Sequence, residues 1–93
     1  METYVILRRS AWETGPDLDK AAAKSTQVGD EEMSDQVRWI RSYVLDEEDG
    51  TLGTVCIYQA VDEDAIMEHA KRSDLPADEV IRVADTVFVR DDP

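Results

Sequence analysis

The sequence contains little of the chemistry that disulfides, metal sites and membrane spans require. Its 93 residues include one cysteine and one histidine, so a disulfide within the chain is excluded. A lone cysteine is typical of a reducing compartment, and we expect a cytoplasmic protein. No run of about 18 apolar residues is present, so the sequence predicts neither a membrane-spanning helix nor a membrane partner.

Basic residues are also scarce. Ten lysines and arginines stand against 22 acids, which gives a formal net charge of −12 at pH 7. A nucleic-acid backbone would be repelled by this charge, and the basic pairs are confined to Arg8–Arg9 and Lys71–Arg72. We therefore expect no nucleic-acid partner, and we interpret the acids as a soluble, self-repelling surface.

The hydrophobic pattern predicts one domain over residues 1–93, with strands and helices in the order β-α-β-β-α-β. Runs of β-forming residues predict the four strands: Glu2–Arg9, Val37–Leu45, Thr54–Tyr58 and residues 79–89. An acidic loop, residues 46–53, joins the two middle strands, and a short acidic tail, residues 91–93, follows the last one.

Two amphipathic segments predict the helices. The first begins at Thr14–Asp17, where Pro16 suits the first turn, and it carries a stripe of mostly small residues: Leu18, Ala21, Ala22, Ser25 and Val28. The second runs from Asp62 to Ser73 with an inward stripe of Ala65, Ile66, His69 and Ala70. The predicted fold class is therefore α+β: a ferredoxin-like, four-stranded antiparallel sheet with two helices on one face.

Strand alternation separates two sets of side chains. We expect the helices to cover Val5, Leu7, Ile40, Val44, Val55 and Ile57, and the open face to carry Tyr4, Ile6, Arg8, Trp39, Arg41, Tyr43, Cys56 and Tyr58. An open face this rich in aromatic and apolar groups is typical of an interface, so we expect a homodimer that forms a dimeric α+β barrel. In this arrangement Trp39, Arg41, Tyr43 and Tyr58 line a small-molecule pocket or the dimer face.

The second half of the chain resembles a known family. The segments RWIRSYV, TVCIYQA and EDAIMEHAKRSDLPADEVIRV contain a Trp-x-x-Ser-Tyr strand, a Cys-x-Tyr strand and an Ile-x-x-His-Ala helix followed by Leu-Pro-Ala-Asp. This pattern is similar to that of a bacterial family of small ferredoxin-like proteins, classified as a domain of unknown function, of which one class is described as nickel-binding. The resemblance covers most of residues 37–83. It implies nickel or another divalent transition metal as a cofactor.

Cys56 and His69 are the side chains of the chain best suited to such a metal, because nickel, zinc and copper prefer imidazole and thiolate ligands. Two ligands are fewer than the roughly four of a closed structural site, and strand alternation places the two residues on different sides of the sheet. Two other interpretations stay open. In the first, both residues are packing residues of the core. In the second, they form a catalytic cysteine–histidine pair, for which no oxyanion-hole motif is visible.

Two hypotheses of function follow. The first is a dimer without enzymatic activity that binds a transition metal through Cys56 and His69. The second is a small dimeric enzyme or ligand-binding module that holds an organic molecule beside Trp39, Arg41, Tyr43 and Tyr58, which is an analogy at the level of the fold.

Overall fold

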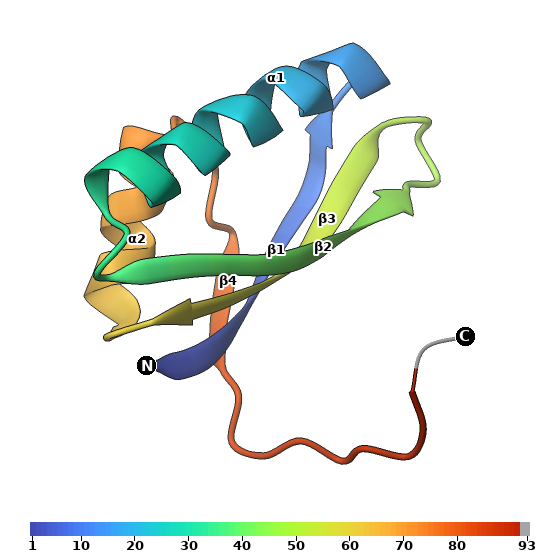
Figure 1. Cartoon of the computed structure of the whole chain (residues 1–93). Helices are drawn as coiled ribbons and strands as arrows, with labels where there is room; N and C mark the ends of the chain where they lie inside the picture. The colour runs from blue at the N-terminus through green and yellow to red at the C-terminus, as the bar shows by residue number, and fades with distance from the viewer. Residues whose placement is uncertain (92–93) are drawn as a thin grey trace.

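The computed structural model describes residues 1–91 and shows a four-stranded sheet with its helices packed on one side (Figure 1). In chain order the elements are β1 (Glu2–Trp12), α1 (Gly15–Gln27), the π-helical turn η1 (Val28–Glu32), β2 (Val37–Asp46), β3 (Leu52–Ala60), α2 (Glu63–Arg72) and β4 (Glu79–Arg82). The strand order is β2-β3-β1-β4, and each neighbouring pair is antiparallel. The predicted ferredoxin-like α+β fold is confirmed.

Both helices begin at the polar residues that the sequence predicts. Thr14 caps α1, where its hydroxyl accepts a hydrogen bond from the Asp17 amide at 3.3 Å. Asp62 caps α2, where its carboxylate accepts from the Ala65 amide at 2.8 Å. These caps satisfy backbone donors that have no partner inside the helix, and they fix where each helix starts over the sheet.

The last strand is shorter than predicted. The prediction extended it over residues 79–89, but β4 ends at Arg82, and residues 83–91 continue as an extended segment away from the sheet (Figure 1). The partner strand explains the difference, because β1 begins at Glu2 and the final bond is the Val83 amide to the Thr3 carbonyl. Positions 92 and 93 of the predicted acidic tail lie outside the described residues.

The assignment of the two sheet faces was wrong for β1 and β3. Tyr4, Ile6 and Arg8 of β1, with Cys56 and Tyr58 of β3, are buried under the helices, whereas Val5, Leu7, Val55 and Ile57 lie half-buried on the open face. Alternation along a strand separates two sets of side chains but does not say which set meets the helices. The prediction assigns the aromatic set to a dimer interface, whereas the fold uses it as the core of the domain.

The second strand divides its residues between the two faces. The pairing of β2 with β3 shifts between Trp39 and Arg41, so that Trp39 stands opposite Tyr58 while Arg41 stands opposite Ile57. An extra residue in one strand reverses the faces that follow it. Trp39 therefore lies on the helix side, and Arg41 and Tyr43 lie on the open side. Ile40 and Val44, predicted to be covered, are exposed.

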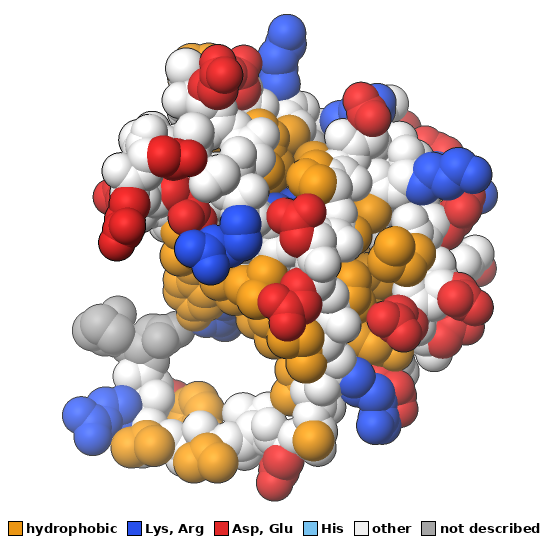
Figure 2. Space-filling view, turned by 180° about the vertical axis from the view of Figure 1, so that it is seen from behind, with side chains coloured by type: hydrophobic (Ala, Val, Ile, Leu, Met, Phe, Trp, Pro, Cys, Tyr) orange, Lys and Arg blue, Asp and Glu red, His pale blue; other side chains and the backbone are white. Residues whose placement is uncertain are grey.

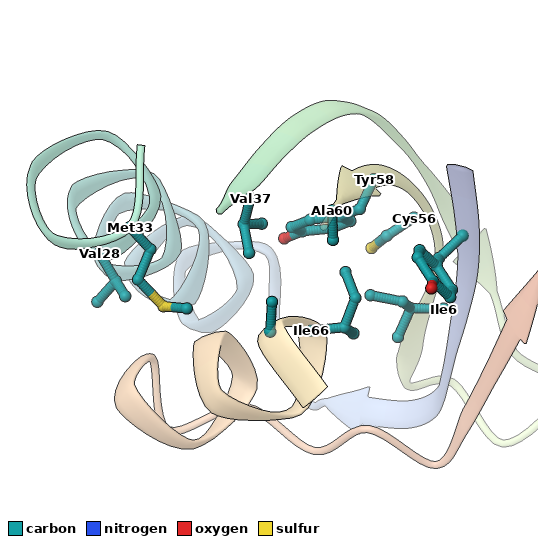
Figure 3. Packing of buried hydrophobic residues seen from close by; sticks show 10 residues of the cluster. Ile6, Val28, Met33, Val37, Cys56, Tyr58, Ala60 and Ile66 are labelled. Atoms are coloured by element: carbon teal, nitrogen blue, oxygen red, sulfur yellow. The ribbon is translucent and has the colours of Figure 1, made fainter. Parts of the chain in front are cut away.

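The core lies between the sheet and the helices (Figure 3). It contains residues from the two central strands, the start of β2, α2 and the segment that follows α1: Tyr4, Ile6, Val28, Met33, Val37, Cys56, Tyr58, Ala60, Ala65 and Ile66. All four residues of the predicted inward stripe of α2 are buried, which confirms that prediction. In residues 1–91, no helix has the length and apolar character needed to cross a bilayer.

Candidate functional site

A cavity of about 370 Å³ lies between α1 and the sheet. The small residues Ala21 and Ala22 form its helix side, and Trp12, Trp39 and Tyr58 contribute aromatic walls. The stripe of small residues on α1 explains why space is left here, because larger side chains at these positions would fill it. The volume falls at the lower end of the range that is typical of small-molecule sites.

Arg8 lies at the wall of this cavity and is buried, with 1% of its surface exposed. Its Nε donates to the Pro76 carbonyl at 2.6 Å, and its Nη1 donates to Cys56 Sγ at 3.2 Å. Nη2 is buried and has no hydrogen-bond partner among residues 1–91. The guanidinium is therefore held in place by two protein groups and keeps one donor nitrogen unused.

Cys56 is a buried thiol that also lines the cavity. Its Sγ donates to Thr54 Oγ1 at 3.3 Å and accepts from Arg8. Thr54 and Cys56 are two residues apart on β3, so the strand geometry places both side chains on the helix side. The cavity thus has a polar floor beside its aromatic walls.

His69 contacts the Tyr58 ring but is not among the residues that line the cavity. Its Nε2 is 3.1 Å from the Ser25 carbonyl, which can only accept, so Nε2 carries the proton in this contact. Burial lowers the pKa of His69 below its ordinary value of 6.5; the hydrogen bond to Ser25 acts in the opposite direction, and the charge of Arg8 adds to the lowering. His69 is consequently neutral at neutral pH.

Tyr58 connects the two sides of the core. Its hydroxyl is 3.1 Å from Ser25 Oγ, its ring meets the His69 ring edge-on at 5.3 Å, and Trp39 stacks on it with ring centroids 5.9 Å apart. Burial raises the pKa of Tyr58 above 10.0, and the Ser25 contact and the Arg8 charge partly offset this effect. The phenol therefore serves as a neutral hydrogen-bonding wall of the cavity.

The structure brings together only part of the predicted site. Trp39, Cys56 and Tyr58 line the cavity from the helix side. The exposed Arg41 also belongs to the lining, although it stands opposite Ile57 of the open face, because β2 is an edge strand and its side chains can reach around the edge of the sheet. Tyr43 does not line it and is exposed on the open face. Cys56 and His69, expected on different sides of the sheet, are both buried on the helix side.

Sequence reasoning did not identify the role of Arg8, Trp12 and Ser25. Arg8 is interpreted from the sequence as half of a basic pair with Arg9 and as a residue of the open face. Alternation correctly places Arg8 on the same face as Tyr4 and Ile6, but that face is the buried one and not the open one.

The residues present do not fit a metal ion within one chain. No group of three or more His, Cys, Asp or Glu side chains in residues 1–91 is arranged to hold one. Cys56 faces the Arg8 guanidinium, and a positive group beside the sulfur opposes a second cation. The Nε2 of His69 already donates to Ser25, which leaves Nδ1 as its ligand atom.

Comparison with known proteins places the chain in a family. The model of a family described as "Nickel responsive protein SCO4226-like" matches residues 4–83. The chain belongs to the SCO4226-like family. The predicted resemblance to a nickel-related family of small ferredoxin-like proteins is thereby confirmed. No curated protein matches the chain in sequence.

A solved structure agrees with this assignment at the level of the fold. The crystal structure of SCO4226 from Streptomyces coelicolor A3(2) superposes with a TM-score of 0.71. It covers 91% of this chain and 99% of its own, with 15% sequence identity. At this identity the likeness extends to the fold and not to individual site residues.

Proposed function

We propose that this member of the SCO4226-like family is a binding module for a small organic molecule held in the cavity between α1 and the sheet. The cavity itself supports the proposal, because its aromatic walls and few polar groups are the usual composition of a ligand site. Its floor is built from buried side chains of β1 and β3, which are the two central strands. The floor of the site therefore belongs to the hydrogen-bonded centre of the sheet.

Tryptophan fluorescence tests this proposal directly, because the chain has two tryptophans and both line the cavity. We would titrate compact aromatic compounds, neutral and acidic, and follow the emission of Trp12 and Trp39. A saturable change is expected. Ala22→Leu fills the cavity and should abolish the change, whereas Ala23→Leu, on the exposed side of the same helix, should preserve it. Equal responses of the two variants would contradict binding in the cavity.

A nickel ion is the second candidate ligand. The name of the family supports it, as does the burial of Cys56 and His69 on the same side of the sheet. Because one chain supplies too few ligands, such a site needs donors from a second chain or from water. We would measure native mass spectra of the untagged protein with added nickel. Stoichiometric uptake that is lost in both Cys56→Ser and His69→Ala is expected, and uptake unaffected by either change would exclude these ligands.

A second copy of this chain is the partner that we propose for the open face of the sheet. This face carries the half-buried Val5, Leu7, Val55 and Ile57, and the extended segment beyond β4 exposes Phe88 at 74%. Figure 2 shows apolar side chains gathered across the middle of one face and along this segment. Exposed apolar surface of this kind favours association.

Light scattering coupled to gel filtration measures the association. Ile81 on β4 lies on the open face, because it pairs with Val5, and it is 44% exposed. Ile81→Lys should shift the mass from dimer to monomer. Met67→Lys on α2 is the matched control, since Met67 is 46% exposed on the helix side. A monomeric parent protein would refute the proposal.

A further inference from the structure

We propose that the ligand of the cavity is a compact organic monocarboxylate and that Arg8 binds its carboxylate group. This inference rests on the proposed function, since it names the chemical class of the molecule that the cavity holds. Three observations carry it: the unpartnered buried nitrogen of Arg8, the use of the acidic residues elsewhere, and the lining of the cavity.

A buried guanidinium without a counter-ion is unfavourable, because the charge has left water and found no opposite charge. Arg8 is 1% exposed and forms no ion pair with a carboxylate of residues 1–91. Its bonds to Pro76 and Cys56 are to neutral acceptors and leave Nη2 unsatisfied. A native fold rarely keeps a buried donor of this kind, so the nitrogen indicates a missing partner.

The missing partner comes from outside the chain. With 22 acids, the protein had many opportunities to neutralise Arg8. Among residues 1–91, exposed arginines form ion pairs instead: Arg9 with Glu47 at 3.0 Å, Arg72 with Glu68 at 3.0 Å and Arg82 with Glu2 at 2.7 Å. The neighbouring residues Arg8 and Arg9 show the contrast most directly: the exposed Arg9 forms an ion pair, and the buried Arg8 forms none within the described part of the chain.

The cavity lining decides which anion fits. Trp12, Trp39 and Tyr58 favour an apolar or aromatic body over a free inorganic anion, which would lose its hydration against these walls. Asp19 is the acidic residue of the lining, and it is exposed at the helix surface. Arg41, also exposed, is the other charged residue of the lining, and its sign is opposite to that of Asp19. With Arg8 the lining therefore carries a formal net charge of +1, which one carboxylate on a small apolar body matches.

The geometry also orients the ligand. Pro76 and Cys56 hold Nε and Nη1, so the guanidinium cannot turn freely, and Nη2 is the nitrogen that has no hydrogen-bond partner among residues 1–91. A hydrogen bond between a cation and a carboxylate is shorter and stronger than one between neutral groups. With the carboxylate at Nη2, the body of the acid lies among the aromatic walls and the alanines of α1.

The experiment compares acids with their uncharged amides. We would titrate the full chain with benzoate, phenylacetate and indole-3-acetate, and with the three corresponding amides, by tryptophan fluorescence and calorimetry at neutral pH. At least one acid is expected to bind about tenfold more tightly than its amide, which is the lower range for a hydrogen bond to a charged group. Added salt should weaken the binding of the acid and leave the binding of the amide unchanged.

The variants isolate Arg8. Arg8→Met keeps a long side chain without charge and should lower the affinity for the acid to the affinity for the amide. Arg9→Met removes the exposed neighbouring charge and should keep the preference. If Arg8→Met does not fold, Arg8→Lys keeps the charge and should retain a reduced preference for the acid.

The outcomes separate this inference from the proposed function. If acids and amides bind equally, or if Arg8→Met keeps the preference for the acid, the role of Arg8 is refuted while the cavity remains a ligand site. If none of the six compounds binds, both the inference and the proposed function are overturned. An acid preference that depends on Arg8 and not on Arg9 supports both.

Discussion

The contact between Tyr58 and Ser25 ties β3 to α1, and its energy can be measured by a double-mutant cycle. The two oxygens are 3.1 Å apart, and both residues are almost completely buried. Ser25→Ala leaves the Tyr58 hydroxyl buried without this partner, which costs about 1–3 kcal/mol. Tyr58→Phe leaves Ser25 Oγ, which can turn to a carbonyl of its own helix, so we expect a smaller loss of about 1 kcal/mol.

The double variant removes both polar groups and should cost less than the sum of the two single changes. We expect a coupling free energy of about 1 kcal/mol, within the range measured for residues in direct contact. For a domain of this length, each kcal/mol corresponds to a change in Tm of roughly 4–8 °C. Urea unfolding followed by circular dichroism, with thermal scans on the same samples, gives both quantities.

The control is Tyr43→Phe, because Tyr43 is exposed on the open face and its hydroxyl stays in water. This change should alter the free energy of unfolding by no more than about 0.5 kcal/mol. Additive losses for Ser25→Ala and Tyr58→Phe would show that the two hydroxyls do not interact, and the argument that this bond positions α1 over the cavity would be refuted.

Three further predictions concern single positions. Burial holds the pKa of His69 below 6.5, so the unfolded chain takes up a proton that the folded chain does not as the pH falls through 6.5. The contribution of His69 to stability is therefore fully present above pH 6.5 and declines below it. His69→Gln should flatten this decline in urea titrations. Asp74 has a φ of 57° directly after α2, so Asp74→Gly should raise stability by up to about 1 kcal/mol in the same assay. A Cβ at Gly53 would lie 2.7 Å from the Arg8 carbonyl, so Gly53→Ala should lower Tm measurably, whereas Gly15→Ala, with open space around it, should not.

The element order and the helix starts could be predicted because local chemistry determines them. Thr14 and Asp62 are residue types that favour helix starts and are followed by periodic apolar positions, and each helix begins directly after one of them. The end of the last strand could not be predicted in the same way. Residues such as Phe88 favour a strand, but a strand needs a neighbour, and β1 does not extend far enough to provide one.

The faces of the sheet depend on packing that no single strand encodes. Tyr4, Cys56 and Tyr58 share one side by alternation, yet only the position of the helices decides that this side is the core. The shift between Trp39 and Arg41 then divides two predicted site residues between opposite faces. A bulge of this kind has no clear signature in the residues themselves, since it follows from the pairing of two strands.

The predicted site was incomplete because its central residue looked like a surface residue. Arg8 belongs to a basic pair in the sequence, and an arginine is rarely buried without a partner. Its burial results from the pairing of β1 with both β3 and β4, which places the middle of β1 in the centre of the sheet. The pairing of Arg9 with Glu47, far along the chain, is likewise a property of the folded state.

A crystal structure of the chain grown with phenylacetate tests the central claim most directly. The account predicts a carboxylate oxygen about 2.7–2.9 Å from Arg8 Nη2, the usual distance for such a charged pair, with the ring between α1 and Trp39. A cavity closed by its own side chains, or an acid bound away from Arg8, would contradict the account.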